Sequence, residues 1–106
     1  MKKVQILTVS AHEEILKTVL RLINSNPDWN ATGAKSKAEA IELFKQYSFD
    51  LVLIGAGIID ELELKQELKL LQPDIVCIDH YGGGSGLLRS EIIQGLERKN
   101  SKNINN

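Results

Sequence analysis

The polar groups that could carry out chemistry in this sequence lie in or directly after a short apolar run at residues 75–78. Asp79 and His80 are adjacent, and neighbouring residues on an extended strand point to opposite faces, which is a poor arrangement for a catalytic pair. His12 is the other histidine, and its separation from Asp79 and His80 matches no metal-ligand spacing. Cys77, the single cysteine, lies inside the apolar run, which favours a buried, inert thiol over a nucleophile. The sequence therefore predicts neither an enzyme nor a metal site, and no cofactor.

Two glycine-rich segments, residues 55–57 and 82–86, could bring the backbone close to a ligand. The candidate ligand-loop residues are Gly55, Gly57, Gly82, Gly83, Gly84 and Ser85. The second segment precedes a predicted helix, whose free N–H groups could hold an anion. It lacks the lysine of a P-loop and the G-x-G-x-x-G spacing. Both interpretations stay open, an anion-binding loop and a flexible turn.

The elements that must position these groups alternate along the chain. Four short segments are predicted strands, three apolar runs at residues 4–9, 50–54 and 75–78 and a less regular one at residues 29–34, and a helical pattern follows each. S-x-x-E patterns at residues 10–13 and 36–39 predict that Ser10 and Ser36 cap the first two helices. Asp60 is expected to cap the third helix, whose buried stripe is predicted to comprise Leu64, Leu68 and Leu71. The βα alternation predicts an α/β domain, with a parallel sheet covered by helices on both faces.

Length and charge narrow the class of protein. The chain has 106 residues, with 13 Lys and Arg against 14 Asp and Glu, which gives a net charge of −1. This balance argues against a nucleic-acid partner and against a polybasic membrane anchor. No apolar run approaches the roughly 20 residues of a membrane-spanning helix. We expect one cytoplasmic domain over residues 1–99 and a disordered polar tail over residues 100–106.

Four segments together resemble the receiver domain of bacterial two-component response regulators, the CheY-like superfamily. They are residues 6–13 (ILTVSAHE), 36–54 (SKAEAIELFKQYSFDLVLI), 60–64 (DELEL) and 72–78 (QPDIVCI). The resemblance extends from residue 3 to about residue 80. It implies a flavodoxin-like three-layer α/β/α fold with strand order 2-1-3-4 and with the family's fifth strand missing.

The same resemblance implies that the family's phosphorylation site is degenerate here. In receiver domains two acidic residues after the first strand hold Mg²⁺, and an aspartate ending the third strand accepts the phosphoryl group. Ser10 and Ala11 stand at the acidic positions, and Gly55 stands at the acceptor position. Asp79 stands where the family has Thr or Ser, and the strand that carries the family's lysine is missing. A hydroxyl and a methyl group cannot replace two carboxylates as Mg²⁺ ligands, so the resemblance implies no aspartyl phosphorylation.

The resulting functional prediction is a receiver-like signalling domain of two-component or phosphorelay type that acts as a phosphorylation-independent protein-interaction module. The alternative is a small-ligand or anion-binding domain that uses the glycine-rich loops. The partner is expected to be a signalling protein or a second copy, because the strand at residues 75–78 would form an open sheet edge. The candidate interface residues on the last helix are Leu88, Ile92, Ile93 and Leu96. A homodimer through residues 75–96 is therefore predicted, with Ile93 as its most informative position; the alternative is that the last helix folds over the open edge and the chain stays monomeric.

Overall fold

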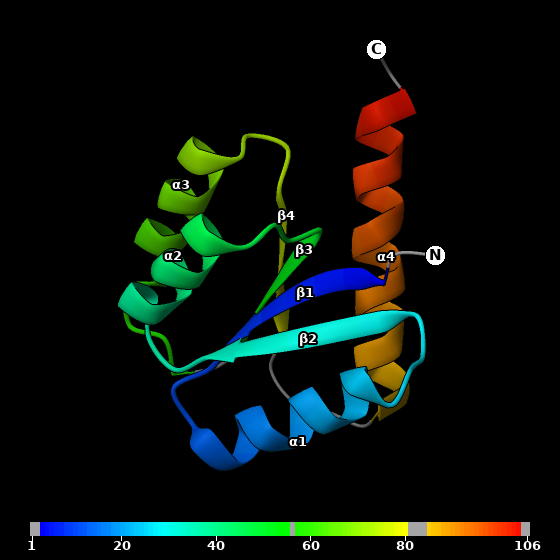
Figure 1. Cartoon of the computed structure of the whole chain (residues 1–106), viewed down its shortest axis with the longest axis horizontal. Helices are drawn as coiled ribbons and strands as arrows, with labels where there is room; N and C mark the ends of the chain where they lie inside the picture. The colour runs from blue at the N-terminus through cyan, green and yellow to red at the C-terminus, as the bar shows by residue number, and fades with distance from the viewer. Residues whose placement is uncertain (1–2, 56, 81–84, 105–106) are drawn as a thin grey trace.

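The computed structural model describes residues 3–55, 57–80 and 85–104 and shows strands and helices in strict alternation (Figure 1). The strands are β1 (Val4–Val9), β2 (Trp29–Ala34), β3 (Leu51–Gly55) and β4 (Val76–His80). The helices are α1 (Glu13–Asn24), α2 (Lys37–Gln46), α3 (Glu61–Leu71) and α4 (Ser85–Ile104). The predicted sequence of elements is thus confirmed.

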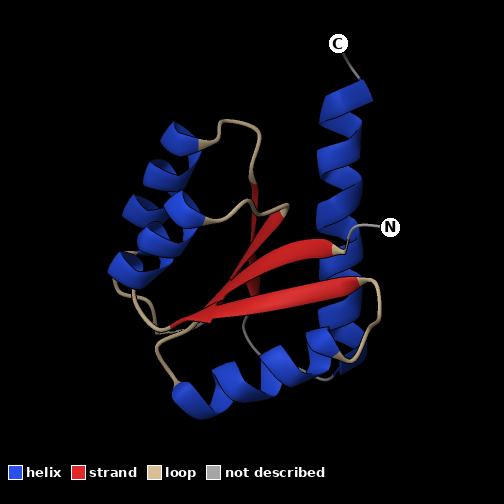
Figure 2. Ribbon diagram, viewed as in Figure 1, coloured by secondary structure: helices blue, strands red, loops and turns tan. Residues whose placement is uncertain are grey.

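The four strands form one parallel sheet in the order β2-β1-β3-β4 (Figure 2). β1 and β3 are central and almost completely buried, as expected for apolar strands covered on both faces. β2 and β4 are the edges, and the described residues contain no fifth strand. The flavodoxin-like α/β fold and the strand order predicted from the sequence are confirmed.

Each face of the sheet has its own core because side chains alternate along the strands. Leu7 of β1 packs on the face covered by α2 and α3, together with Phe44 and Leu64. Ile6, its neighbour, packs on the opposite face with Ile23 of α1 and Ile92 of α4. The helices therefore form one layer on either side of the sheet, α2 with α3 and α1 with α4 (Figure 1).

The last helix lies close against β3 and β4, and a glycine permits this approach. A Cβ atom on Gly95 would lie 2.8 Å from Leu51 Cδ1 and 3.3 Å from Ile78 Cγ2. The helix continues to Ile104, past the expected domain boundary at residue 99, because no proline or glycine follows Gly95 to end it. Although α4 has 20 residues, no described helix is apolar enough over a sufficient length to cross a membrane.

The start of α1 differs from the sequence prediction. Ser10 is not its N-cap: the cap position is His12, and the helix begins at Glu13. The backbone N–H of Ser10 donates to Ala34 O at 3.0 Å, which extends the pairing of β1 with β2 by one residue. Because Ser10 continues the strand, its side chain accepts a 3.3 Å hydrogen bond from His12 N–H within the loop and caps no helix. The prediction for Ser36 is confirmed, since its Oγ accepts from Glu39 N at 3.2 Å.

The buried stripe of α3 is shorter than predicted. Leu64 and Leu68 are fully buried against the sheet, whereas Leu71 is 48% exposed. Leu71 is the last residue of the helix, and the chain turns there toward Pro73 before β4 begins. The helical period alone placed Leu71 on the core face, but the core does not extend as far as the final turn.

Candidate functional site

The carboxyl ends of β1 and β3 bring Ser10 and Gly55 together, as the resemblance implied. A Cβ atom on Gly55 would lie 3.3 Å from Ser10 Cβ and 3.3 Å from Val9 O. Ser10 is buried, and its hydroxyl oxygen accepts a hydrogen bond from the N–H of His12. The two positions thus meet in a tightly packed contact that contains no carboxylate.

Ala11 and Gly57 complete this contact from the two adjoining loops. We call the meeting point of Ser10, Ala11, Gly55 and Gly57 the crevice. Gly57 has φ of 90°, in the region that side-chain-bearing residues rarely adopt. A Cβ atom at Gly57 would lie 2.9 Å from His12 Nε2 and 3.2 Å from Ala11 Cβ. The loop after β3 therefore rests directly on the loop after β1, and small residues make that contact.

Asp79 lies apart from this crevice, because its side chain turns to α3. Its carboxylate forms an ion pair with Lys65 at 2.9 Å. Glu61, one turn before Lys65, has its pKa raised, chiefly by the neighbouring carboxylate of Asp79 and then by desolvation. Asp79 is thus part of a charged cluster with α3 rather than a group facing Ser10 and Gly55.

A shallow hollow of about 230 Å³ lies beside the crevice, between the loops that follow β1, β2 and β3. Its lining residues are Ala11, Lys35, Ser36, Lys37, Gly57, Ile58, Ile59 and Asp60. Lys35 is paired with Glu13 at 3.1 Å, and Lys37 is paired with Glu63 at 2.9 Å and with Glu67 at 3.1 Å. These carboxylates raise the pKa of Lys37 and neutralise much of the positive charge that would attract an anion.

The remaining loop candidates are less informative. Gly82, Gly83 and Gly84 lie outside the described residues, and Ser85 is the first residue of α4. Within the described part of the chain, no three His, Cys, Asp or Glu side chains lie close enough together to hold a metal ion.

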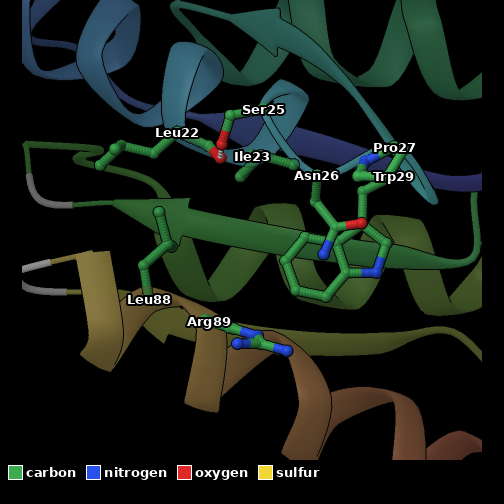
Figure 3. Close-up of a pocket in the computed structure, with 8 residues that line it drawn as sticks. All are labelled: Leu22, Ile23, Ser25, Asn26, Pro27, Trp29, Leu88 and Arg89. Carbon is green, nitrogen blue, oxygen red and sulfur yellow. Dashed lines mark hydrogen bonds between the residues drawn. The ribbon is translucent and has the colours of Figure 1, made fainter.

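A second hollow, of about 540 Å³, separates the end of α1 from the start of α4 (Figure 3). It is lined by Leu22, Ile23, Ser25, Asn26, Pro27, Trp29, Leu88 and Arg89. Figure 3 shows Leu88 and Arg89 of α4 on one side and the α1 residues with Trp29 on the other. An adjoining hollow of about 330 Å³ shares Leu22 and Leu88 and reaches the buried ring of His80. We call these two hollows the α1–α4 groove.

The candidate interface residues do not form one exposed surface. Leu88 and Ile92 are buried in the core, and Leu96 packs partly against it. Ile93 is 39% exposed. It lies one helical turn after Arg89, so it faces the side of α4 that borders the α1–α4 groove.

A further hollow, of about 460 Å³, lies beside the outer edge of β4. Its lining residues are Cys77, Ile78, Asp79, Glu91, Gln94, Gly95 and Arg98. Glu91, Gln94 and Arg98 were not singled out by the sequence reasoning, although their spacing of three and four residues places them on one side of a helix. Cys77 is half-buried, and desolvation raises the pKa of its thiol, as expected for an unreactive cysteine.

Comparison with solved structures shows which fold this is. A CheY-like response regulator receiver domain protein from Methanospirillum hungatei JF-1 is 15% identical, with 95% of this chain and 99% of that chain covered and a TM-score of 0.80. The response regulator TrrA from Thermotoga maritima, in complex with Mg²⁺-BeF, is 16% identical, with coverage of 91% and 100% and a TM-score of 0.77. An adenylate cyclase structure from Rhodopirellula baltica is 16% identical, with coverage of 95% and 93% and a TM-score of 0.82.

No protein-family model matches the chain, and no curated protein matches it. At these identities the likeness shows the fold alone. The chain has the fold of response regulator receiver domains, as the resemblance in its sequence implied.

Proposed function

We propose that this chain is a receiver-like signalling domain of two-component type that works through protein contact and has lost aspartyl phosphorylation. The observation that carries the proposal is the crevice at the carboxyl ends of β1 and β3. Ser10, Ala11 and Gly55 occupy it, so it offers no acidic pair for Mg²⁺ and no carboxylate to accept a phosphoryl group.

The packing of the crevice supports the same proposal. A longer side chain at Gly55 would press on Ser10 and on the Val9 carbonyl, and any side chain at Gly57 would press on His12. A metal ion with its water ligands needs space that these loop contacts occupy. The Thermotoga maritima structure is described in complex with Mg²⁺-BeF, and we propose that this chain does not bind that pair.

The proposal assigns a binding role and no enzymatic one. A catalytic site needs a nucleophile or base held within reach of a second polar group in a cavity, and the crevice contains small side chains in contact with one another. The fold supports signalling only by analogy, since one fold carries many functions. The expected cytoplasmic location belongs to this proposal and rests on the composition of the chain.

The alternative function, anion binding by the loops, has one supporting observation. The 230 Å³ hollow beside Gly57 carries Lys35 and Lys37 in its wall and lies at the start of α2. Both lysines are already paired with carboxylates, so the proposed interaction role is the better supported of the two.

The test is phosphorylation of the intact chain with acetyl phosphate and Mg²⁺, measured by intact-protein mass spectrometry. We expect an unchanged mass, while an active receiver domain treated in parallel gains one phosphoryl group. A variant with Ser10→Asp, Ala11→Asp and Gly55→Asp is expected not to restore full labelling, because the described residues contain no fifth strand to carry the family's lysine. Stoichiometric labelling of the unmodified chain, reversed by hydroxylamine, would overturn the proposal.

A further inference from the structure

β4 is an edge strand with no neighbouring strand on its outer side among the described residues. Such an edge presents unpaired N–H and C=O groups, which are a template for pairing with another chain. α3 flanks β4 on one face of the sheet and α4 flanks it on the other (Figure 1). The 460 Å³ hollow between β4 and the side of α4 lies where the side chains of an added strand would fit.

The carboxyl end of this edge is acidic. Asp79 and Glu61 lie together on the α3 side, with Lys65 between them at 2.9 Å from Asp79 and 3.7 Å from Glu61. On the α4 side, Glu91 Oε1 lies 2.5 Å from Nδ1 of His80, the last residue of β4. Three carboxylates and one ammonium group therefore surround the end of the strand.

The amino end of the same edge is basic. Lys69 of α3 donates a 3.1 Å hydrogen bond to the carbonyl of Ile75, directly before β4. Arg98 of α4 lies at this end as well, because its neighbour Lys99 forms an ion pair with Asp50 at the start of β3. Asp74, directly before Ile75, offsets one of these two cations, so the amino end keeps a net positive charge and the carboxyl end a net negative one.

We propose that the β4 edge pairs with the β4 edge of a second copy, antiparallel, so that two sheets join into one. The inference rests on the proposed function, because it identifies the partner of the interaction module. An antiparallel copy places the acidic end of one edge against the basic end of the other, whereas a parallel copy would place like charges together. The charge pattern therefore favours a second copy of the chain as the partner, and it favours the antiparallel orientation over the parallel one.

Antiparallel pairing of two identical strands implies a two-fold axis between them, and the α4 helices beside the strands fit that axis. Glu91 and Arg98 lie at equal distances along α4 from its midpoint at Gln94 and Gly95. Gly95 packs over Ile78, the central residue of β4. An axis near Ile78 therefore brings Arg98 of one copy opposite Glu91 of the other, and the strands and the helices pair in one arrangement.

The test is the oligomeric state of the full chain, measured by light scattering over a range of protein concentrations at low and high salt. We expect a dimer that salt weakens, with slower amide hydrogen exchange over residues 76–80 at high protein concentration. Arg98→Glu is expected to weaken the dimer by about tenfold or more, since each substitution acts twice in a two-fold assembly. Circular dichroism checks that the variant remains folded.

Two control variants change the other side of the same helix. Arg89→Glu makes the same charge reversal at the α1–α4 groove, and Ile93→Glu removes the exposed apolar residue one helical turn after Arg89. Both are expected to leave the dimer intact, whereas the sequence-based choice of Ile93 as the informative position expects Ile93→Glu to dissociate it. A chain that stays monomeric at high micromolar concentration, or a dimer that Ile93→Glu dissociates and Arg98→Glu does not, would overturn the inference. A monomeric chain that acetyl phosphate does not label contradicts only the dimer, and a labelled dimer contradicts only the proposed function.

Discussion

The crevice above β1 and β3 and the outer edge of β4 are two regions of this sheet that differ in chemistry. The crevice is made of small residues in mutual contact, Ser10, Ala11 and Gly57 among them. The edge is open, and charged side chains from two helices surround it. Contacts between loops fill the crevice, whereas the edge is the surface at which we propose that a second copy binds.

The difference shows that the framework of this fold does not depend on the groups in its crevice. Both faces of the sheet carry a hydrophobic core, and the central strands are buried on both faces, although neither Ser10 nor Ala11, the two residues directly after β1, is acidic. Packing of apolar side chains sets the sheet, and the polar residues at its carboxyl end are free to change. The absence of a fifth strand in the described part then determines where new contacts can form.

The largest expected effect comes from removing the anchor that holds α4 beside the edge. Ile92 is fully buried between α4 and the sheet, so Ile92→Ala should lower the free energy of unfolding by about 2 to 5 kcal/mol. Urea denaturation followed by the fluorescence of Trp29 measures it. Ile93→Ala is the matched control, because Ile93 is 39% exposed and its truncation should change stability by no more than about 1 kcal/mol. Equal effects of the two substitutions would show that α4 is not docked as described.

A smaller effect is expected in the crevice, where backbone geometry and close contact coincide. Gly57→Ala places a Cβ on a residue with φ of 90° and within 2.9 Å of His12 Nε2, so it should destabilise the fold by about 1 to 2 kcal/mol. Gly33→Ala is the comparison, since the Cβ there meets the movable end of Leu20 and the backbone is not strained. Thermal unfolding of both variants checks the order of the two effects. A harmless Gly57→Ala would mean that the loops do not pack together as tightly as described.

The smallest expected effect concerns the acidic end of the edge and its dependence on pH. The pKa of Glu61 is raised above its usual 4.5, so the folded state binds that proton more tightly than the unfolded chain does. Stability therefore falls as pH rises through the raised pKa, and Glu61→Gln should stabilise the protein at pH 7 by about a few tenths of a kcal/mol, a small value because solvent reaches the half-buried carboxylate and screens its charge. The gain should vanish as pH falls below 4.5.

Denaturation of both chains at pH 7 and at pH 4 measures this difference, with Arg98→Glu in the background so that only monomers are compared. A variant that is less stable than the parent at pH 7 would show that the pairing of Glu61 with Lys65 outweighs its repulsion by Asp79.

Features set by neighbouring residues could be predicted from the sequence. The buried run of β3 and the cap that Ser36 provides follow from the apolar and capping patterns, and the strand order follows from the resemblance to receiver domains. Predictions failed where a local sequence pattern was compatible with two different structures. Ser10 matched a capping pattern but continued the pairing of β1, and Leu71 matched the apolar period but lay beyond the end of the core.

The sequence by itself determined the elements, their order and the chemistry missing from the crevice, because each depends on residue type at a position or on a short repeat. Tertiary structure alone decided which groups stand beside the edge of β4. Lys69 of α3 and Arg98 of α4 lie 29 positions apart in the chain, and they reach the same end of one strand only because the two helices pack on opposite faces of the sheet. Since that docking minimises exposed apolar surface, the position of each charge follows from the packing of its whole helix and not from its neighbours in sequence.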